Sequence, residues 1–318
     1  MRYWGAILPL LSRRNVLTDA VRGLVGVSLG AGLLRPLLAQ APPARAPVTD
    51  LGGDFRVLSL GQTNVLAVAD STGVALVDGA PAGRAAALAE LVATLPQTGR
   101  VHTLFNTHWH PEHTGSNESL GQAGATIVAQ DNTKQWLTTD VTWPWSEETV
   151  APLPAVGLPN KTFFDETELM VGGRTVRCGH LRDCPHTDGD MYVYFPEENV
   201  LAVGDAVWGT GWPSIDWWTG GWIGGLVGGL DTLFYVANAD TRIVPARGPM
   251  LTHADLRKHY DMYSVIWERL VKTLYSGGGP EEALAAKPTQ EFDAIMGPSD
   301  AFVERAFQSL WAYLSPDA

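Results

Sequence analysis

The sequence predicts an α/β fold with mixed β-sheets. The first observation is alternation: strand-like "VHTLFNT" (101–107) precedes helix-like "TGSNESLGQAG" (114–124), and strand-like "TIVAQ" (126–130) follows. Such alternation is typical of helices packed on a sheet. The second is composition: 45% of the 318 residues are hydrophobic, which is ordinary for a chain with a sizeable core. The length fits two average domains, or one large α/β domain with an N-terminal extension.

The elements before this region begin with an antiparallel meander. Residues 54–78 contain three short apolar segments separated by Gly-Gln-Thr-Asn and Asp-Ser-Thr-Gly, which are turn-forming sequences. An Ala/Leu-rich helix is predicted over 81–95, and Pro96 is expected to end it.

The second half contains two further strand pairs. One pair is predicted within 161–181, joined across Gly172-Gly173, and the other within 190–208, around a turn at 196–199. A final short strand is expected in "TRIVPARGP" (241–249). From Thr252 onward the pattern is helical to Leu314, and "THAD" is a capping box at its start.

A glycine-rich segment, residues 220–239, allows two interpretations. Its recurring GxxxG spacing is found in transmembrane helix dimers. However, Asp231 interrupts the apolar run, and basic anchors are missing from its flanks. We therefore expect a helix that packs closely against a sheet.

The first 46 residues differ in composition from the rest. They contain six arginines and one acidic residue, with "SRRNVL" (12–17), a Gly-rich apolar run and the small-residue stretch "LLAQAPPARA". This order is that of a twin-arginine export signal. We expect residues 1–46 to be such a signal, the export machinery to be a partner, and the exported protein to be periplasmic or secreted. The alternative is a cytosolic protein with a basic tail.

The charge of residues 47–318 excludes one class of partner. Without the six arginines and one aspartate of the first 46 residues, the chain's 22 basic and 34 acidic residues leave a net charge of −17. So acidic a body is evidence against a nucleic-acid substrate, because binding nucleic acid requires Lys and Arg to neutralise phosphates. We expect a small-molecule substrate, and no membrane contact beyond the signal. Cys178 and Cys184 are expected either to form one disulfide across a turn or to be buried free thiols.

Donor side chains for a metal are concentrated after the strand at 101–107. "NTHWHPEHTG" (106–115) contains His108, His110, Glu112 and His113. Further donors stand beside turns downstream, namely His186, Asp188 and Asp190 in "PHTDGD" and Asp205 in "AVGDAVW". Catalytic zinc binds His nitrogens and carboxylate oxygens and keeps one position open for water. Three groups of donors at strand ends therefore predict a metal site.

The order of these motifs resembles the signature of the metallo-β-lactamase superfamily. The resemblance spans about 57–249 and is carried by four motifs in order: His108-x-His110-x-Glu112-His113, His186-Thr187-x-Gly189-Asp190, Gly204-Asp205 and "IVPARGP". It implies a four-layer αββα sandwich of two mixed sheets, a domain at 47–250, and a C-terminal helical extension at 251–318 packed on that domain. It further implies a first zinc site made by His108, His110 and His186.

Two departures affect the family's second zinc site. The resemblance implies that His113 and a bridging Asp205 would belong to that site. Its other two ligands in the family are an Asp, which is Glu112 here, and a His, which is Arg247 here. A guanidinium cannot ligate a metal, because it stays protonated and has no acceptor atom. Our hypothesis is one well-held zinc, with Glu112 and Asp205 as ion-pair partners of Arg247 or as proton carriers. The alternative keeps a second zinc on His113, Asp205 and Glu112, with Arg247 turned away.

The predicted function is metal-dependent hydrolysis of an ester, lactone, thioester or amide. Zinc on three histidines can activate water, Asp205 or Glu112 could take its proton, and Arg247 could orient a substrate carboxylate or an oxyanion. Two alternatives remain: a β-lactam hydrolase, and a non-catalytic binding protein on a degenerate metallohydrolase scaffold. Trp-rich segments at 143–145 and 208–222 flank the metal edge in the family and suit an apolar ligand, or else fill the core.

Overall fold

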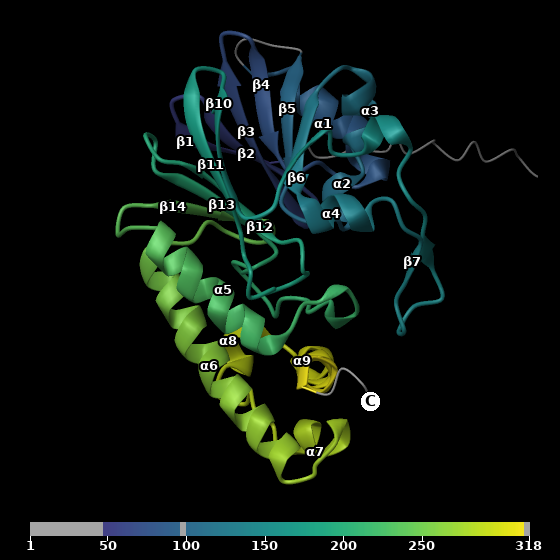
Figure 1. Ribbon diagram of the computed structural model, residues 1–318. Helices are drawn as coiled ribbons and strands as arrows, with labels where there is room; N and C mark the ends of the chain where they lie inside the picture. The colour runs from purple at the N-terminus through teal and green to yellow at the C-terminus, as the bar shows by residue number, and fades with distance from the viewer. Residues whose placement is uncertain (1–46, 96–99, 315–318) are drawn as a thin grey trace, which may run out of the picture. The chain divides into compact units, whose positions relative to one another are not determined.

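Two β-sheets pack face to face between two groups of helices (Figure 1). The computed structural model describes residues 47–95 and 100–314, so the predicted export signal and Pro96 lie outside the described residues. The implied αββα sandwich is confirmed.

The first sheet has seven strands in the order β1-β2-β3-β4-β5-β6-β9. The predicted meander is confirmed as β2, β3 and β4, and the strands on either side of the histidine-rich loop as β5 and β6. Pairing is antiparallel from β1 to β4 and parallel from β4 to β9. The strand bounds are β1 (Val48–Gly52), β2 (Phe55–Leu60), β3 (Thr63–Asp70), β4 (Gly73–Val77), β5 (Val101–Asn106), β6 (Thr126–Gln130) and β9 (Lys161–Phe163).

The second sheet has five strands, β10 (Glu166–Val171), β11 (Arg174–His180), β12 (Met191–Phe195), β13 (Val200–Gly204) and β14 (Arg242–Pro245). Both predicted strand pairs are confirmed, and only β13 and β14 run parallel. Gly172 and Gly173 make the first turn with φ values of 56° and 81°, a conformation that suits glycine. A two-stranded ribbon, β7 (Val141–Thr142) with β8 (Thr149–Val150), lies outside both sheets.

The main core lies between the sheets. Phe55 of β2 and Phe195 of β12 meet edge to face with ring centroids 5.1 Å apart, and both side chains are fully buried. Every residue of β3 and β4 is buried, because a second apolar cluster with α1 (Ala85–Val92) covers their other face. This two-sided burial explains why these strands read as apolar runs instead of alternating patterns.

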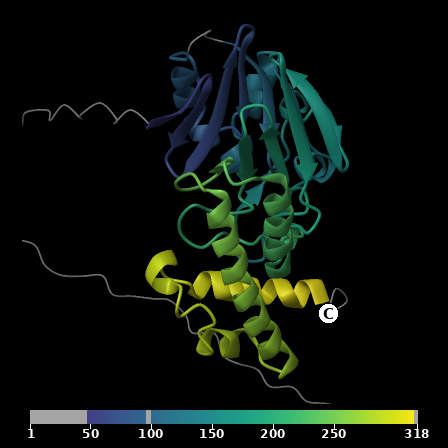
Figure 2. The same cartoon turned by 90° about the vertical axis from the view of Figure 1, so that its left-hand side faces the viewer.

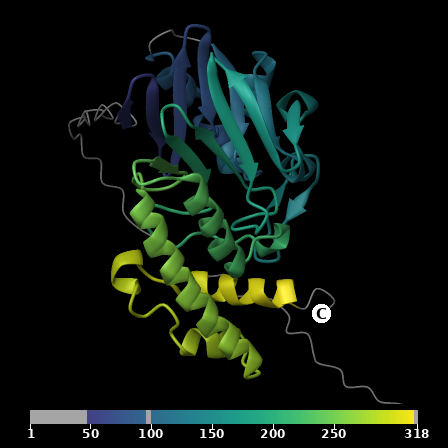
Figure 3. The same ribbon diagram turned by 60° about the vertical axis from the view of Figure 1, so that its left-hand side comes forward.

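Helices form the outer layers. Beyond α1, the first sheet is accompanied by η1 (Ala82–Arg84), α2 (Pro111–Thr114), α3 (Asn117–Gln122), α4 (Asp131–Trp136) and η2 (Ala155–Gly157). The second is accompanied by η3 (Trp217–Thr219), α5 (Ile223–Val236), α6 (His253–Tyr275), α7 (Pro280–Ala285), α8 (Asp293–Met296) and α9 (Asp300–Leu314). Thr252 and Asp255 form the predicted capping box of α6. Figures 2 and 3 show α6 extending away from the sheets and α9 crossing it.

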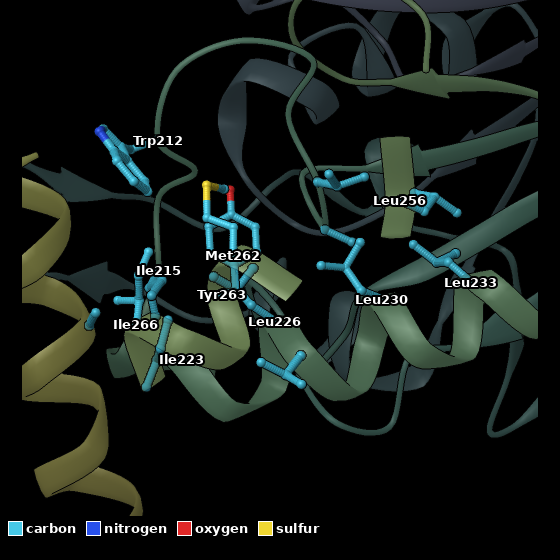
Figure 4. Close-up of a cluster of buried hydrophobic side chains, with 14 of the residues drawn as sticks. Trp212, Ile215, Ile223, Leu226, Leu230, Leu233, Leu256, Met262, Tyr263 and Ile266 are labelled. Carbon is cyan, nitrogen blue, oxygen red and sulfur yellow. The ribbon is translucent and has the colours of Figure 1, made fainter. Parts of the chain in front are cut away.

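The glycine-rich segment is helix α5, and its predicted close packing is confirmed. Its apolar side chains follow one another along the helix (Figure 4) and join the cluster that contains Tyr192 and Leu201 of the second sheet. A Cβ at Gly225 would lie 2.2 Å from the carbonyl oxygen of Asp183, so only glycine allows this approach. Within the part of the chain that the structure describes, no helix combines the length and apolar character needed to cross a membrane.

The two cysteines are free thiols in the structure. Cys178 is buried on β11, where burial raises the pKa of its thiol. Cys184 lies in the turn after that strand, and burial together with nearby carboxylates raises its pKa to about 12.

Candidate metal centre

The predicted donors converge at the ends of strands from both sheets. His108 and His110 follow β5, and His113 lies on α2, which begins directly after them. His186 follows β11, and Asp205 follows β13. Apart from Glu112, these ligand candidates are all buried.

His108, His110 and His186 form one group. A ring nitrogen from each lies within 4.8 Å of the others. Their ring centroids are 4.6 to 4.9 Å apart, with interplanar angles of 70° to 90°. The sequence placed these three residues in one site, and the structure brings them together.

Hydrogen bonds assign the protons in this group. His186 Nδ1 lies 2.8 Å from the carbonyl oxygen of Ser214, and His110 Nε2 lies 2.9 Å from Asp216 Oδ2. Both partners only accept, so these two ring nitrogens are the donors. The other nitrogens, His110 Nδ1 and His186 Nε2, lie 3.0 Å apart. They are the two ring nitrogens that remain for a shared cation.

His108 completes the set. Its Nδ1 contacts Thr107 Oγ1 at 3.2 Å, and its Nε2 is buried without a hydrogen-bond partner among the described residues. Burial and the neighbouring histidine charges hold the pKa of His108 well below its usual value, so its ring is neutral. Three buried imidazoles, each with one nitrogen engaged by the protein and one remaining, fit a zinc-type ion.

His113 and Asp205 form a second group that shares His108. His113 Nε2 lies 3.3 Å from Asp205 Oδ2, and His113 Nδ1 lies 3.3 Å from Asp78 Oδ2. Burial disfavours a charged ring, but these two carboxylates outweigh it and raise the pKa of His113 to about 10. Burial also opposes charge on Asp205, yet the surrounding histidines hold its pKa well below the usual value.

Arg247 lies beside this second group. Its Nη2 donates to Glu112 Oε1 at 2.9 Å, and its Nε lies 3.6 Å from Asp205 Oδ1. The guanidinium stacks on Trp208, 4.6 Å from the ring centroid, and Trp208 Nε1 donates to Asp205 Oδ1 at 2.9 Å. Glu112 belongs to neither ligand group among the described residues and is instead the ion-pair partner of Arg247.

Three aspartates support the ligands. Asp190, a donor candidate in the sequence, accepts from the backbone of His186 and Thr187 and so fixes the turn that presents His186. Sequence reasoning missed Asp78, which accepts from Thr107 N at 2.8 Å, and Asp216, the partner of His110. Outer partners of this kind orient metal-binding histidines. A strand-end aspartate was a weak signal for Asp78, whereas nothing in the sequence marked Asp216.

The Trp-rich segments divide between the site and the core. Trp143 meets His110 edge to face at 5.7 Å and donates from Nε1 to Asp216 Oδ2 at 2.9 Å. Trp145 stacks next to Trp143, with centroids 6.5 Å apart, and reaches the surface. Trp212 instead stacks on Phe302 of α9, at 4.7 Å. Trp143 therefore lies beside the metal centre and Trp212 in the core, while an apolar ligand for these tryptophans stays a prediction.

Comparison with known proteins gives one family and a shared fold. Residues 58–278 match the metallo-beta-lactamase superfamily. A hydroxyacylglutathione hydrolase from Hyphomonas neptunium is 29% identical over 113 residues, which is 35% of this chain and 36% of that protein. The match thus spans about a third of the curated relative.

Two solved structures illustrate the shared fold. A metallo-beta-lactamase from Pontibacter korlensis has a TM-score of 0.54 and 17% identity, covering 69% of this chain and 99% of that one. The inverting sec-alkylsulfatase Pisa1 from Pseudomonas sp. has a TM-score of 0.62 and 12% identity, covering 86% of this chain and 51% of that one. The superfamily match covers more than half of the chain and includes both ligand groups, so this protein belongs to the metallo-beta-lactamase superfamily.

Proposed function

We propose that the protein is a metal-dependent hydrolase of small molecules that holds one zinc ion on His108, His110 and His186. The observation that carries this proposal is that these three buried histidines each bring a ring nitrogen within 4.8 Å of the others, with His110 Nδ1 3.0 Å from His186 Nε2. Imidazole also binds iron and manganese, but three histidines with an open fourth position are an established ligand set of catalytic zinc.

We favour a single ion because His108 belongs to both ligand groups, and once it binds the first ion the second group has too few ligands left. His108 has one available nitrogen, since its Nδ1 is engaged by Thr107. His113 and Asp205 would then remain, with the Nε of Arg247 only 3.6 Å from Asp205. A fixed cation at that distance opposes a second metal ion. Glu112, the remaining candidate, is paired with Arg247.

The chemistry follows from this arrangement. A zinc ion on three histidines lowers the pKa of bound water to about 7 and polarises a carbonyl group. Asp205 Oδ2 lies 3.8 Å from both His108 Nε2 and His186 Nε2 and 3.3 Å from His113 Nε2, so it is placed to accept the proton of an attacking water. Arg247, oriented by Glu112, is placed to hold a substrate carboxylate or a developing oxyanion.

An ester, lactone, thioester or amide fits these groups. The hydroxyacylglutathione hydrolase relative makes a thioester the first bond to test. The acidic body makes a nucleic acid a poor substrate. We further propose export through the twin-arginine machinery, supported by Arg13-Arg14 and the small-residue stretch near position 41. Replacing both arginines by lysine should keep the protein in the cytoplasm in a cell-fractionation assay.

The test combines zinc analysis with hydrolysis of an acyl thioester, an acyl ester and a chromogenic β-lactam. The purified protein should contain one zinc per chain and hydrolyse the thioester or the ester. His186→Ala should lose both zinc and turnover. His253→Ala is the matched control, because this histidine lies on α6, hydrogen-bonded to the carbonyl of Phe234, and should leave both unchanged.

The alternatives make different predictions. Two tightly held zinc ions per chain would contradict the single-ion site. Preference for the β-lactam would identify a lactam hydrolase. A non-catalytic binding protein would hydrolyse nothing, and its ligand affinity would survive replacement of His108 and His110 by alanine.

A further inference from the structure

A separate cavity lies between α6, α8 and the loops around positions 210 and 250. Its volume is about 540 Å³, within the roughly 300–1,000 Å³ common for small-molecule sites. Its walls are mainly apolar side chains: Met250, Leu251, Met262, Phe292, Ile295 and Met296. Unbranched, polarizable methionines adapt to apolar ligands of varied shape.

The polar groups around this cavity leave no charge for a ligand to neutralise. Lys258 Nζ donates to Asp255 Oδ1 at 2.8 Å, so the two charged residues that line the cavity satisfy each other. His259 also lines it, and burial lowers the pKa of its ring, which is neutral at physiological pH. This lining suits hydrocarbon better than a charged group.

The cavity adjoins a second cavity that contains Arg247. Thr210 lines it and also lines a polar cavity of about 480 Å³ that contains Arg247 and Trp208. Arg247 in turn reaches Asp205, at 3.6 Å. The two cavities are thus neighbours that share Thr210.

The rim carries exposed apolar side chains. Ile295 is 84% exposed and Met250 is 37% exposed, although both line the cavity. Exposed apolar surface around a concave site commonly marks a place where a ligand binds. A hydrocarbon chain that passes between them would cover part of this surface.

We propose that this cavity binds the hydrocarbon tail of the substrate, so that the substrates are amphiphiles with an acyl chain attached to the hydrolysable bond. The inference rests on the proposed hydrolase function and names its substrate class. The polar cavity at Arg247 receives the end of the molecule near the reacting carbonyl, and the methionine-rich cavity receives the tail.

Chain length is the direct test. We expect kcat/KM for acyl esters from acetyl to decanoyl to rise with each added methylene, by up to about fourfold per step, until the cavity is filled. Binding of butanoate, hexanoate, octanoate and decanoate to the zinc-stripped protein, measured by calorimetry, should follow the same trend without depending on turnover.

Rim variants make the test specific to this cavity. Ile295→Asp and Met250→Asp place a charge at its mouth without disturbing the buried core, and each should reduce decanoyl-ester kcat/KM at least tenfold while leaving the acetyl ester unchanged. Phe164→Asp is the matched control, since Phe164 is 74% exposed and lies outside the residues that line the cavity. It should leave both esters unchanged.

The tail-binding cavity and the hydrolase function can be refuted separately. A flat chain-length series together with no decanoate affinity would overturn the tail site, while zinc content and acetyl-ester turnover would still support the hydrolase. Decanoate binding that the rim variants abolish, without hydrolysis of any ester, would support an apolar-ligand site and contradict the hydrolase.

Discussion

Asp216 offers a sharp test of the metal centre, because it acts on the site only through a ligand. Its Oδ2 accepts from His110 Nε2 at 2.9 Å, from Trp143 Nε1 at 2.9 Å and from Thr219 Oγ1 at 2.7 Å. Its Oδ1 accepts from Thr219 N at 3.2 Å. Asp216→Asn keeps the shape but replaces one acceptor oxygen with an NH₂ group.

The magnitude follows from these contacts. If the amide oxygen remains at the Oδ2 position, the NH₂ group faces Thr219 N–H, and one buried donor loses its partner. That loss costs about 1–3 kcal/mol in the free energy of unfolding. The neutral amide is also a weaker acceptor for His110, and loss of such outer partners typically weakens metal affinity about 10–100-fold.

The assay is competition for zinc against a chromogenic chelator, with urea unfolding of the zinc-stripped protein alongside it. Thr219→Val is the control, because it removes a hydroxyl donor to Asp216 and leaves the bond to His110 intact. We expect its zinc affinity to stay within about threefold of the parent. If Asp216→Asn lowered stability but left the zinc affinity unchanged, Asp216 would be a structural residue and our assignment of His110 Nδ1 as a ligand atom would lose its support.

Three further predictions concern other parts of the molecule. Arg247→His restores the family's imidazole at that position and should raise the zinc content from one to two per chain in elemental analysis; an unchanged content would show that Arg247 is not what prevents a second ion. Hydrogen bonds from Lys258 and Thr252 lower the pKa of Asp255 to about 2, so its stabilising effect is present above its usual pKa and is lost as the pH falls toward 2. Asp255→Asn should therefore lower Tm clearly at pH 6 and little at pH 2, whereas an equal loss at both values would refute the ion-pair account. Phe195→Ala should cost about 3–5 kcal/mol in urea unfolding, and a loss below about 1 kcal/mol would show that the sheets repack.

The strands could be predicted where turn chemistry separates apolar segments. Gly172-Gly173 is an example, because two adjacent glycines in the sequence indicate a turn. In the structure both glycines have positive φ values and form the turn between β10 and β11. Four strands escaped prediction, since β7 and β8 have two residues each, β9 has three, and β1 contains turn-forming Asp50 and Gly52. Their pairing depends on neighbouring strands and not on local pattern.

The ligand histidines could be predicted because they stand in short motifs, whereas their supports come from remote loops. Asp216 lies 106 residues from His110 in the sequence, and only the folded chain brings the two together. The pairing of Glu112 with Arg247, 135 residues apart, rested on a comparison with the family pattern. The cavity between α6 and α8 had no signal at all, because its lining comes from segments that each read as ordinary amphipathic helix or loop.

Anomalous diffraction at the zinc absorption edge, on crystals of the zinc-loaded protein, tests the central claim most directly. We predict one strong peak, about 2.0–2.1 Å from the nitrogens of His108, His110 and His186, with an open side toward Asp205. A second peak of equal height between His113 and Asp205, or a peak away from the three imidazoles, would contradict it.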